Sequence, residues 1–154
     1  MRHRNEKGFT LIELLIVVAI IGIIAAIAIP NLLNAIQRGK QKRTMADIRA
    51  IGTAVESYAV DANSYPRGVT TLTNVRSSVE AHISPSFIRD APDTDGWGGD
   101  LLYQSNARGS EYTIISYGKD GVRSTASFRK TTDFDCDIIY QDGGFTAWPE
   151  GIQN

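Results

Sequence analysis

The stretch GFTLIELLIVVAIIGIIAAIAIP, residues 8–30, decides the fold, because it is almost wholly apolar and contains one acidic residue, Glu13. From Leu11 to Ile29 nearly every one of the 19 residues is apolar, and as a helix they span about 29 Å, close to the ~30 Å of bilayer hydrocarbon. The apolar side chains contribute roughly −6 kcal/mol to membrane insertion, whereas an acid costs about +3 kcal/mol at the helix centre and less near an end. The segment is therefore predicted to span a membrane despite Glu13.

Charge is distributed unevenly along the 154 residues. Residues 1–43 contain seven Lys and Arg against two acidic residues, and residues 44–154 contain nine against fifteen. Basic residues before the apolar segment favour a single-pass topology with a cytoplasmic N terminus. The acidic body predicts that the chain has no nucleic-acid partner.

Three interpretations of the apolar segment remain open on composition alone. A secretory signal peptide would use Ala26-Ile27-Ala28 as its cleavage site, but the apolar core is long for that class. A plain membrane anchor explains the length but gives Glu13 no role. The third interpretation depends on the order of a basic leader, the sequence Gly8-Phe9-Thr10-Leu11-Ile12-Glu13 and the apolar run.

That order resembles the N terminus of type IV pilins and type II secretion pseudopilins. The resemblance implies that a prepilin peptidase cleaves between Gly8 and Phe9 and methylates the new N-terminal Phe9, while Glu13 acts in assembly. It also implies a precursor in the bacterial inner membrane and a later location in a periplasmic pseudopilus or an extracellular pilus. The implied partners are further copies of the chain, the inner-membrane assembly platform, and minor pilins or pseudopilins.

The assembly role of Glu13 has a physical basis. The new N terminus carries an α-ammonium, because an α-amine has a pKa of roughly 8 and methylation keeps it basic. A carboxylate and an ammonium are each costly in a medium of low dielectric constant and less so when they are paired. We therefore expect Glu13 to pair with the ammonium of a neighbouring copy. If it instead reaches the cytoplasmic interface, it contributes nothing to assembly.

Beyond the apolar run, the helix is predicted to continue to about Ala62. Pro30 is assigned to the assembly segment and is expected to kink or locally melt the helix, because it lacks a backbone donor. Apolar side chains then recur at helical spacing and predict one apolar stripe on an otherwise polar helix: Leu33, Ile36, Ile48, Ile51, Val55, Tyr58 and Ala62. The part from Ile48 to Ala62 is expected to be the face on which the body folds. The sequence Asn63-Ser64-Tyr65-Pro66 ends the helix.

The rest of the chain predicts a small antiparallel sheet. A short helix is expected at Val79–Ile83, with strands beginning at Leu101 and covering Glu111–Tyr117 and Asp137–Gln141; Asn106–Gly109 forms a hairpin loop. The fold class is α+β, pilin-like, with a long N-terminal helix and a β-rich head. The predicted divisions are the leader 1–8, the membrane or filament-core helix 9–30, the amphipathic half 31–64 and the head 65–154.

Two stretches of the head resemble type II secretion pseudopilins of the major type. The sequence Asp95-Gly96-Trp97-Gly98 is similar to an Asp-Pro-Trp-Gly turn, with Gly96 expected to make the turn less rigid. The acidic stretch around Asp120 and Asp133–Asp137 is similar to a calcium-binding loop. If residues 133–137 are extended, alternation puts three carboxylates on one face, and calcium favours such oxygen ligands. The predicted calcium ligands are Asp120, Asp133, Asp135 and Asp137; a solvated acidic loop is the alternative.

No catalytic site is predicted. His3 lies in the leader, His82 is isolated, and Cys136 has no histidine nearby in sequence. The sequence therefore predicts a structural filament subunit and not an enzyme, with a major pseudopilin preferred because a lone cysteine cannot close a disulfide loop. A type IV pilin of a surface pilus is the alternative, and a membrane-anchored binding protein is the rival from another class.

Overall fold

The structure, a computed structural model, describes residues 8–124 and 130–150. The chain divides into two compact units, Met1–Ala35 and Ile36–Asn154. The leader predicted from the sequence lies outside the described residues, apart from Gly8.

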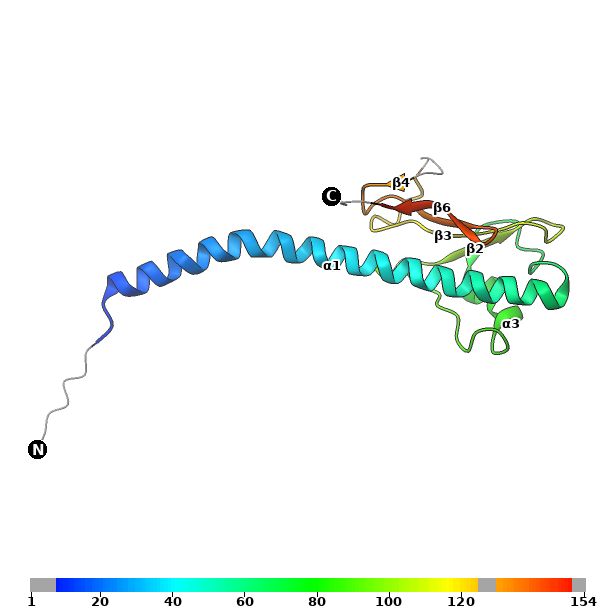
Figure 1. The fold of residues 1–154 in the computed structure, drawn as a ribbon, viewed down its shortest axis with the longest axis horizontal. Helices are drawn as coiled ribbons and strands as arrows, with labels where there is room; N and C mark the ends of the chain where they lie inside the picture. The colour runs from blue at the N-terminus through cyan, green and yellow to red at the C-terminus, as the bar shows by residue number, and fades with distance from the viewer. Residues whose placement is uncertain (1–7, 125–129, 151–154) are drawn as a thin grey trace, which may run out of the picture. The chain divides into compact units, whose positions relative to one another are not determined.

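One helix, α1 (Leu11–Ala62), contributes to both units (Figure 1). Its end at Ala62 agrees with the turn sequence that follows, where Asn63 has a positive φ of 54°. The helix is unbroken at Pro30, so the predicted local melting is wrong. Pro30 removes one backbone donor, and the side-chain amide of the adjacent Asn31 donates to the carbonyl of Ile27, one turn earlier in the helix, at 3.0 Å.

The first unit presents its apolar side chains to the surroundings. From Phe9 to Leu33, all of the large apolar side chains of this unit are at least 46% exposed, including Leu11 at 81% and Ile27 at 65%. Within the described residues, α1 is the helix that is long and apolar enough to cross a membrane, and none of its most apolar window is buried. Such a surface needs lipid or other copies of the helix as a partner.

In the second unit, α1 buries one face against the sheet. The buried residues are Gln41, Thr44, Ile48, Ile51, Gly52, Ala54 and Val55. Ile48, Ile51 and Val55 are buried, as expected for the face on which the body folds, whereas Tyr58 is half-buried and Ala62 is exposed. Leu33 and Ile36, the first residues of the apolar stripe, are 54% and 46% exposed. Gly52 allows close approach, since a Cβ there would overlap the ring of Tyr140.

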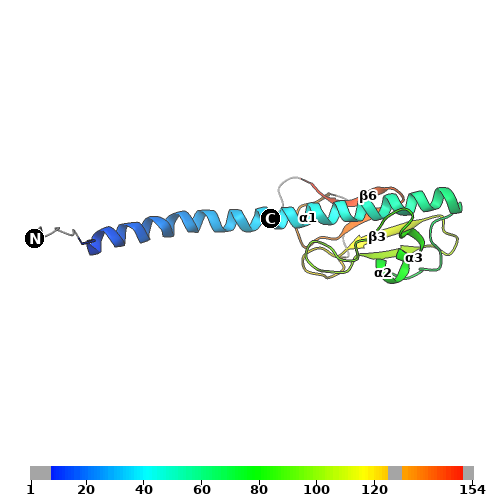
Figure 2. The same cartoon turned by 90° about the horizontal axis from the view of Figure 1, so that it is seen from below.

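The sheet has the strand order β1-β2-β3-β5-β6-β4 and lies along the second half of α1 (Figures 1 and 2). Its strands are β1 (Thr73–Asn74), β2 (Leu102–Ser105), β3 (Tyr112–Ser116), β4 (Lys130–Thr131), β5 (Ile138–Gln141) and β6 (Gly144–Pro149). All neighbouring pairs are antiparallel except β4 and β6, which are parallel. The fold is therefore α+β, as predicted.

The elements between α1 and β2 are short. They are β1, α2 (Val75–Ser78) and α3 (Glu80–Ile83), and α3 matches the predicted short helix to within one residue. The core side chains come from α1, α2, α3 and the central strands, with Tyr103 and Tyr112 among the largest that are fully buried.

The strands β2, β3 and β5 agree with the predicted strands, but β1, β4 and β6 were not predicted. β6 begins at a glycine, ends at a proline and has no clean alternation, since its burial pattern has one fully buried residue, Ala147. Its pairing with β5 also shifts register between Ile139 and Tyr140. Pairing across the sheet, and not local pattern, makes this segment a strand.

Candidate assembly and processing site

Helix α1 begins with a reciprocal pair of hydrogen bonds between Thr10 and Glu13. The Glu13 carboxylate accepts from the Thr10 backbone amide at 2.8 Å and from the Thr10 hydroxyl at 2.7 Å. The Thr10 hydroxyl in turn accepts from the Glu13 backbone amide at 3.2 Å. This arrangement is a capping box, in which two backbone donors at the helix start are satisfied by side chains three residues apart.

The capping box leaves room for a further partner at Glu13. Both bonds from Thr10 end on the same carboxylate oxygen, Oε2. A carboxylate has about four lone-pair sites, so Glu13 has remaining capacity for a cationic donor. Within one copy of the chain, the hydrogen bonds from Thr10 thus stabilise the Glu13 carboxylate, and a cation of a neighbouring copy can still bind to it.

Gly8 and Phe9 precede the helix in a non-helical segment that is exposed. The Phe9 side chain is 79% exposed, and a Cβ at Gly8 would meet nothing within 4 Å. The peptide bond between them is therefore sterically accessible from several sides.

A tight loop fastens the sheet to α1 at its first buried turns. Asp95 is only 4% exposed and accepts from the backbone amides of Trp97 and Gly99, each at 2.8 Å. Its second oxygen accepts from the Ser116 hydroxyl at 2.7 Å. The side chain organises the loop and ties it to β3.

The same loop contacts α1 directly. The Gly96 amide donates to the Thr44 hydroxyl at 2.8 Å, and the Trp97 indole donates to the Gln37 side chain at 2.7 Å. A Cβ at Gly96 would overlap the carbonyl of Lys40. Glycine at this position therefore allows close approach, and the turn is anchored on both sides; that Gly96 makes the turn less rigid than a proline would stays a prediction.

The predicted acidic ligands do not share one face. Residues 133–136 form a bend and turn instead of an extended segment. The Asp133 carboxylate accepts from the Asp135 amide at 3.1 Å, and Asp135 lies 3.8 Å from the ammonium of Lys119. Both are thereby held within the turn or by a cation, so the alternation argument for residues 133–137 fails.

Asp120 and Asp137 do come close to one another. Asp137 is 3% exposed, and both of its oxygens accept from the Ser124 amide, at 3.1 and 3.2 Å. Burial, together with the nearby charge of Asp120, raises the pKa of Asp137 above its ordinary value. The nearby Arg123 acts in the opposite sense and lowers the pKa of Asp137, so part of the repulsion between the two carboxylates is already offset by a cation of the chain.

The fit to calcium is therefore limited to this pair. Among residues 8–124 and 130–150, no three His, Cys, Asp or Glu side chains are grouped closely enough to hold a metal ion. Calcium takes six to eight oxygen ligands, which include backbone carbonyls and water. Of the four predicted ligands, only Asp120 and Asp137 lie close to each other, and each also accepts a backbone amide, Asp120 from Val122 at 3.0 Å and Asp137 from Ser124.

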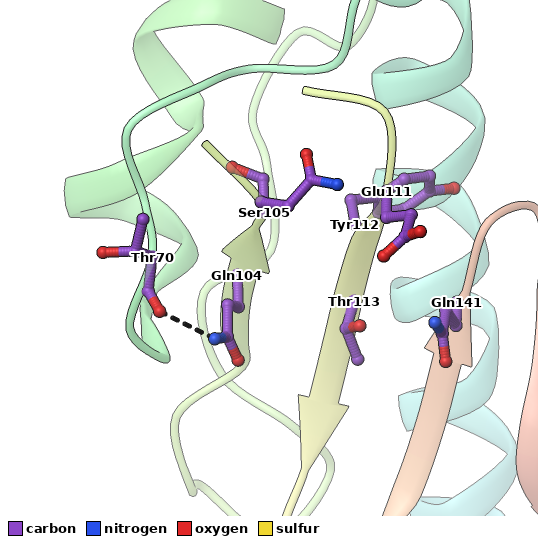
Figure 3. A pocket seen from close by; sticks show the side chains of 8 residues that line it. Thr70, Gln104, Ser105, Glu111, Tyr112, Thr113 and Gln141 are labelled. Carbon is purple, nitrogen blue, oxygen red and sulfur yellow. Dashed lines mark hydrogen bonds between the residues drawn. The ribbon is translucent and has the colours of Figure 1, made fainter. Parts of the chain in front are cut away.

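A polar groove of about 270 Å³ lies on the sheet, lined by residues of β2, β3 and β5 and by Thr70 (Figure 3). Gln104 within it donates to the Thr70 carbonyl at 2.7 Å.

His82 and Cys136, the histidine of the body and the single cysteine, lie in different surroundings. His82 stacks edge-on against Tyr58 with ring centroids 5.7 Å apart. Burial raises the pKa of the Cys136 thiol, which disfavours the nucleophilic thiolate.

Two functional contacts were missed in the sequence. Thr10 was detectable, because Thr-x-x-Glu before an apolar run is the sequence signature of a capping box. The contact between Gly96 and Thr44 had no such signal, since the two residues are separated by 52 positions.

Comparison with known proteins adds two family matches. Residues 31–133 match the family described as type II secretion system protein G, and residues 3–29 match the prokaryotic N-terminal methylation motif. The chain is 31% identical over 131 residues to the type II secretion system core protein G of Klebsiella michiganensis, covering 81% of this chain and 92% of the relative. It is 32% identical over 125 residues to core protein G of Vibrio cholerae, covering 78% and 85%.

A solved structure is also similar. The crystal structure of the major pseudopilin from the type 2 secretion system of enterohaemorrhagic Escherichia coli is 27% identical, with a TM-score of 0.45. The match covers 71% of this chain and 93% of the solved chain.

Proposed function

The chain belongs to the type II secretion system protein G family, and on that premise we propose how its parts act in a structural pseudopilin subunit. The precursor is anchored in the inner membrane by the apolar first half of α1. A prepilin peptidase cleaves between Gly8 and Phe9 and methylates Phe9, and the mature chain then joins a helical filament. The match of residues 3–29 to the N-terminal methylation motif supports this order.

The observation that carries the proposal is the exposure of α1. Its large apolar side chains from Leu11 to Ile36 are exposed, and the most apolar window is unburied. Hydrophobic association requires this area to leave water. In the precursor, lipid covers it, and in the filament, the same helices of other copies cover it.

Glu13 makes the transfer from lipid to filament favourable in our proposal. Thr10 supplies two donors to one carboxylate oxygen in the single copy. The α-ammonium of Phe9 from a neighbouring copy supplies a charged donor to the remaining capacity, and charge-assisted hydrogen bonds are the strong ones. The pair sets the axial register, because only one displacement of the two helices brings the groups together.

The acidic pair Asp120 and Asp137 is proposed to hold calcium. The ion would neutralise the repulsion at the buried Asp137 and so hold the segment after β3 against the start of β5. This part of the proposal rests on the burial of Asp137 and its proximity to Asp120.

The proposed partners follow from the same family. They are further copies of this chain, the prepilin peptidase, the inner-membrane assembly platform and minor pseudopilins. The N terminus of the precursor lies in the cytoplasm, and the filament extends into the periplasm.

Two experiments test the proposal. N-terminal sequencing of the mature chain should show a methylated phenylalanine, Phe9, as the first residue; a start at Ile29 would mean ordinary secretion, and an uncut Met1 a simple anchor. Glu13→Ala and Glu13→Gln should abolish filaments while cleavage continues. Glu111→Gln, an exposed acid on the β2–β3 loop, is the matched control, and filaments of normal yield in Glu13→Ala would contradict the pairing.

A further inference from the structure

A groove of about 450 Å³ runs along the exposed side of α1 beside β6. Its lining includes Lys42, Met45, Arg49, Thr53 and Phe145. The Arg49 guanidinium lies over the Phe145 ring, 5.3 Å from the ring centroid. The groove is therefore lined both by apolar side chains, such as Met45 and Phe145, and by the cationic side chains Lys42 and Arg49 of α1.

The cations of the groove continue toward the membrane-proximal end of the body. Arg38, Lys42 and Arg49 are four and seven positions apart, so they share one side of the helix. All three are exposed, and no ion pair joins any of them to a carboxylate within residues 8–124 and 130–150. Arg43, on another side, is by contrast paired with Asp47 at 3.5 Å. We name Arg38, Lys42 and Arg49 with the adjoining groove the basic stripe.

Exposed aspartates gather at one end of the sheet. Asp100 lies two residues before the start of β2, and Asp133 lies in the turn five residues before β5, where its carboxylate also accepts from the Asp135 amide at 3.1 Å. Because β2 and β5 each pair antiparallel with β3, their starts lie at the same end of the sheet. Both aspartates are exposed, and we name this region the acidic end.

The acidic end and the basic stripe lie at the same level along α1. The loop that precedes Asp100 is fixed to Gln37 through the Trp97 indole at 2.7 Å, and to Thr44 through the Gly96 amide at 2.8 Å. The basic stripe runs from Arg38 to Arg49, a rise of about 16 Å along the helix. Within one copy, the acidic end and the basic stripe form no ion pair with each other, but their positions along the axis of α1 overlap.

We propose that the basic stripe of one copy receives the acidic end of a neighbouring copy of the same chain in the filament; this rests on the proposed function. All copies enter the membrane in the same direction, so their α1 helices lie parallel. A neighbour displaced along the axis by less than the length of the stripe then sets its acidic end beside Lys42 and Arg49. Such a contact joins two different surfaces and does not close on itself, so it propagates along a filament.

The chain as a whole has a formal net charge of only −1, so the placement of its charges matters more than their sum. A contact between unlike patches selects one relative displacement of two copies, because other displacements bring like charges together. The basic stripe therefore supplies specificity to the body, in addition to the apolar contacts of the first half of α1.

The test is charge reversal with rescue in the full chain, scored by filament yield. The double variant Lys42→Glu, Arg49→Glu and the double variant Asp100→Lys, Asp133→Lys should each lower the yield at least about tenfold, because like charges then face each other. The fourfold variant that combines them should recover most of the yield. Arg108→Glu and Glu111→Lys, exposed on the loop at the opposite end of the sheet, are the controls and should leave the yield unchanged.

Cross-linking provides a second measurement that does not depend on reversed charges. In a Cys136→Ser background, cysteines replacing Arg49 and Asp133 should form an intermolecular disulfide in assembled filaments, whereas cysteines replacing Arg108 and Arg49 should not. Wild-type yield in the Lys42→Glu, Arg49→Glu variant, or no cross-link between positions 49 and 133, would overturn the proposal. Loss without rescue would assign the stripe to another ligand, such as anionic lipid, and would also overturn it.

These outcomes are distinct from failure of the proposed function. If the wild-type chain is not cleaved before Phe9 and forms no filament, both the proposed function and the proposed interface are wrong. If the wild type is cleaved and assembles in a Glu13-dependent way while the stripe variants assemble normally, only the interface falls.

Discussion

The Thr10 hydroxyl lies 2.7 Å from the Glu13 carboxylate and donates to it, while accepting from the Glu13 amide at 3.2 Å. The acid in the apolar segment therefore has an intramolecular partner before any assembly takes place. This relationship explains how one carboxylate is tolerated at the start of a membrane helix. It also separates two roles of Glu13, helix capping within a copy and pairing between copies.

The first prediction concerns Thr10. Thr10→Val should remove the hydroxyl of the capping box and weaken the helix start by about 1 kcal/mol, lowering filament yield several-fold while Glu13 remains. Thr10→Ser retains the hydroxyl and should assemble as the wild type does. Pulse-chase analysis of cleavage, followed by filament yield, distinguishes a processing defect from an assembly defect; equal yields in the two variants would remove the capping role.

The second prediction concerns two glycines whose replacement by alanine should change the free energy of unfolding in opposite directions. Gly96→Ala places a Cβ against the Lys40 carbonyl and should lower the free energy of unfolding by about 1–3 kcal/mol. Gly39→Ala, in α1 with nothing within 4 Å of the added carbon, should raise it by about 0.5–1 kcal/mol through helix propensity. Denaturant unfolding of the full chain in detergent measures both, and a stable Gly96→Ala variant would show that the loop is not held closely to α1.

The third prediction concerns alkaline pH. Burial, followed by the proximity of Glu56, raises the pKa of Tyr65 above its ordinary value, and burial likewise raises the pKa values of Tyr103 and Tyr112. The unfolded chain releases phenolic protons near pH 10, while the folded chain retains them. Stability is thus fully present below pH 10 and falls above it, by about 1.4 kcal/mol per pH unit for each retained proton.

Ultraviolet absorbance of the phenolates, measured together with circular dichroism, checks the predicted loss of stability above pH 10. Ionisation of these tyrosines should be delayed beyond pH 10 and should coincide with loss of structure. Tyr112→Phe should make the fall with pH shallower, although it also removes the 2.9 Å hydrogen bond to Glu56. Smooth ionisation of all six tyrosines near pH 10 in the folded chain would count against the buried cluster.

The fourth prediction concerns calcium. If Asp120 and Asp137 bind the ion, calcium at about 100 times the dissociation constant should stabilise the chain by about 2.7 kcal/mol and raise the midpoint of thermal unfolding. Asp120→Asn should remove this increment, whereas Asp100→Asn, an exposed neighbour, should retain it. An identical midpoint in calcium and in chelator would withdraw the metal from the proposal.

The sequence predicted the elements whose signals are local. The apolar run, the helix end near Ala62 and the strands β2, β3 and β5 each depend on neighbours within a few positions, and they appear where the pattern places them. The same is true of the hairpin loop after β2, where Gly109 donates to the Asn106 carbonyl at 3.1 Å. The capping box was also local, so its omission was a missed signal.

The acidic stretch shows where local reasoning failed. Alternation predicts a shared face for Asp133, Asp135 and Asp137 only if the segment is extended, and the chain instead turns there. The turn follows from contacts with other segments, since Gly118 lies against the carbonyls of Phe134, Asp135 and Cys136, and Lys119 donates to the Phe134 carbonyl at 3.0 Å. No pattern within five residues contains that information.

By itself, the sequence determined which segment of this protein is predicted to anchor it in the membrane and which residues are predicted to act in processing and assembly. The order of leader, Gly8-Phe9, Glu13 and apolar run predicts an anchored precursor and an assembly helix, because membrane insertion and helix capping depend on residues close together in the chain. Tertiary structure alone decided which carboxylates meet, why Gly96 must be glycine, and where β6 pairs. These depend on contacts between segments separated by as many as 60 positions, which form only when α1 and the sheet bury a common core.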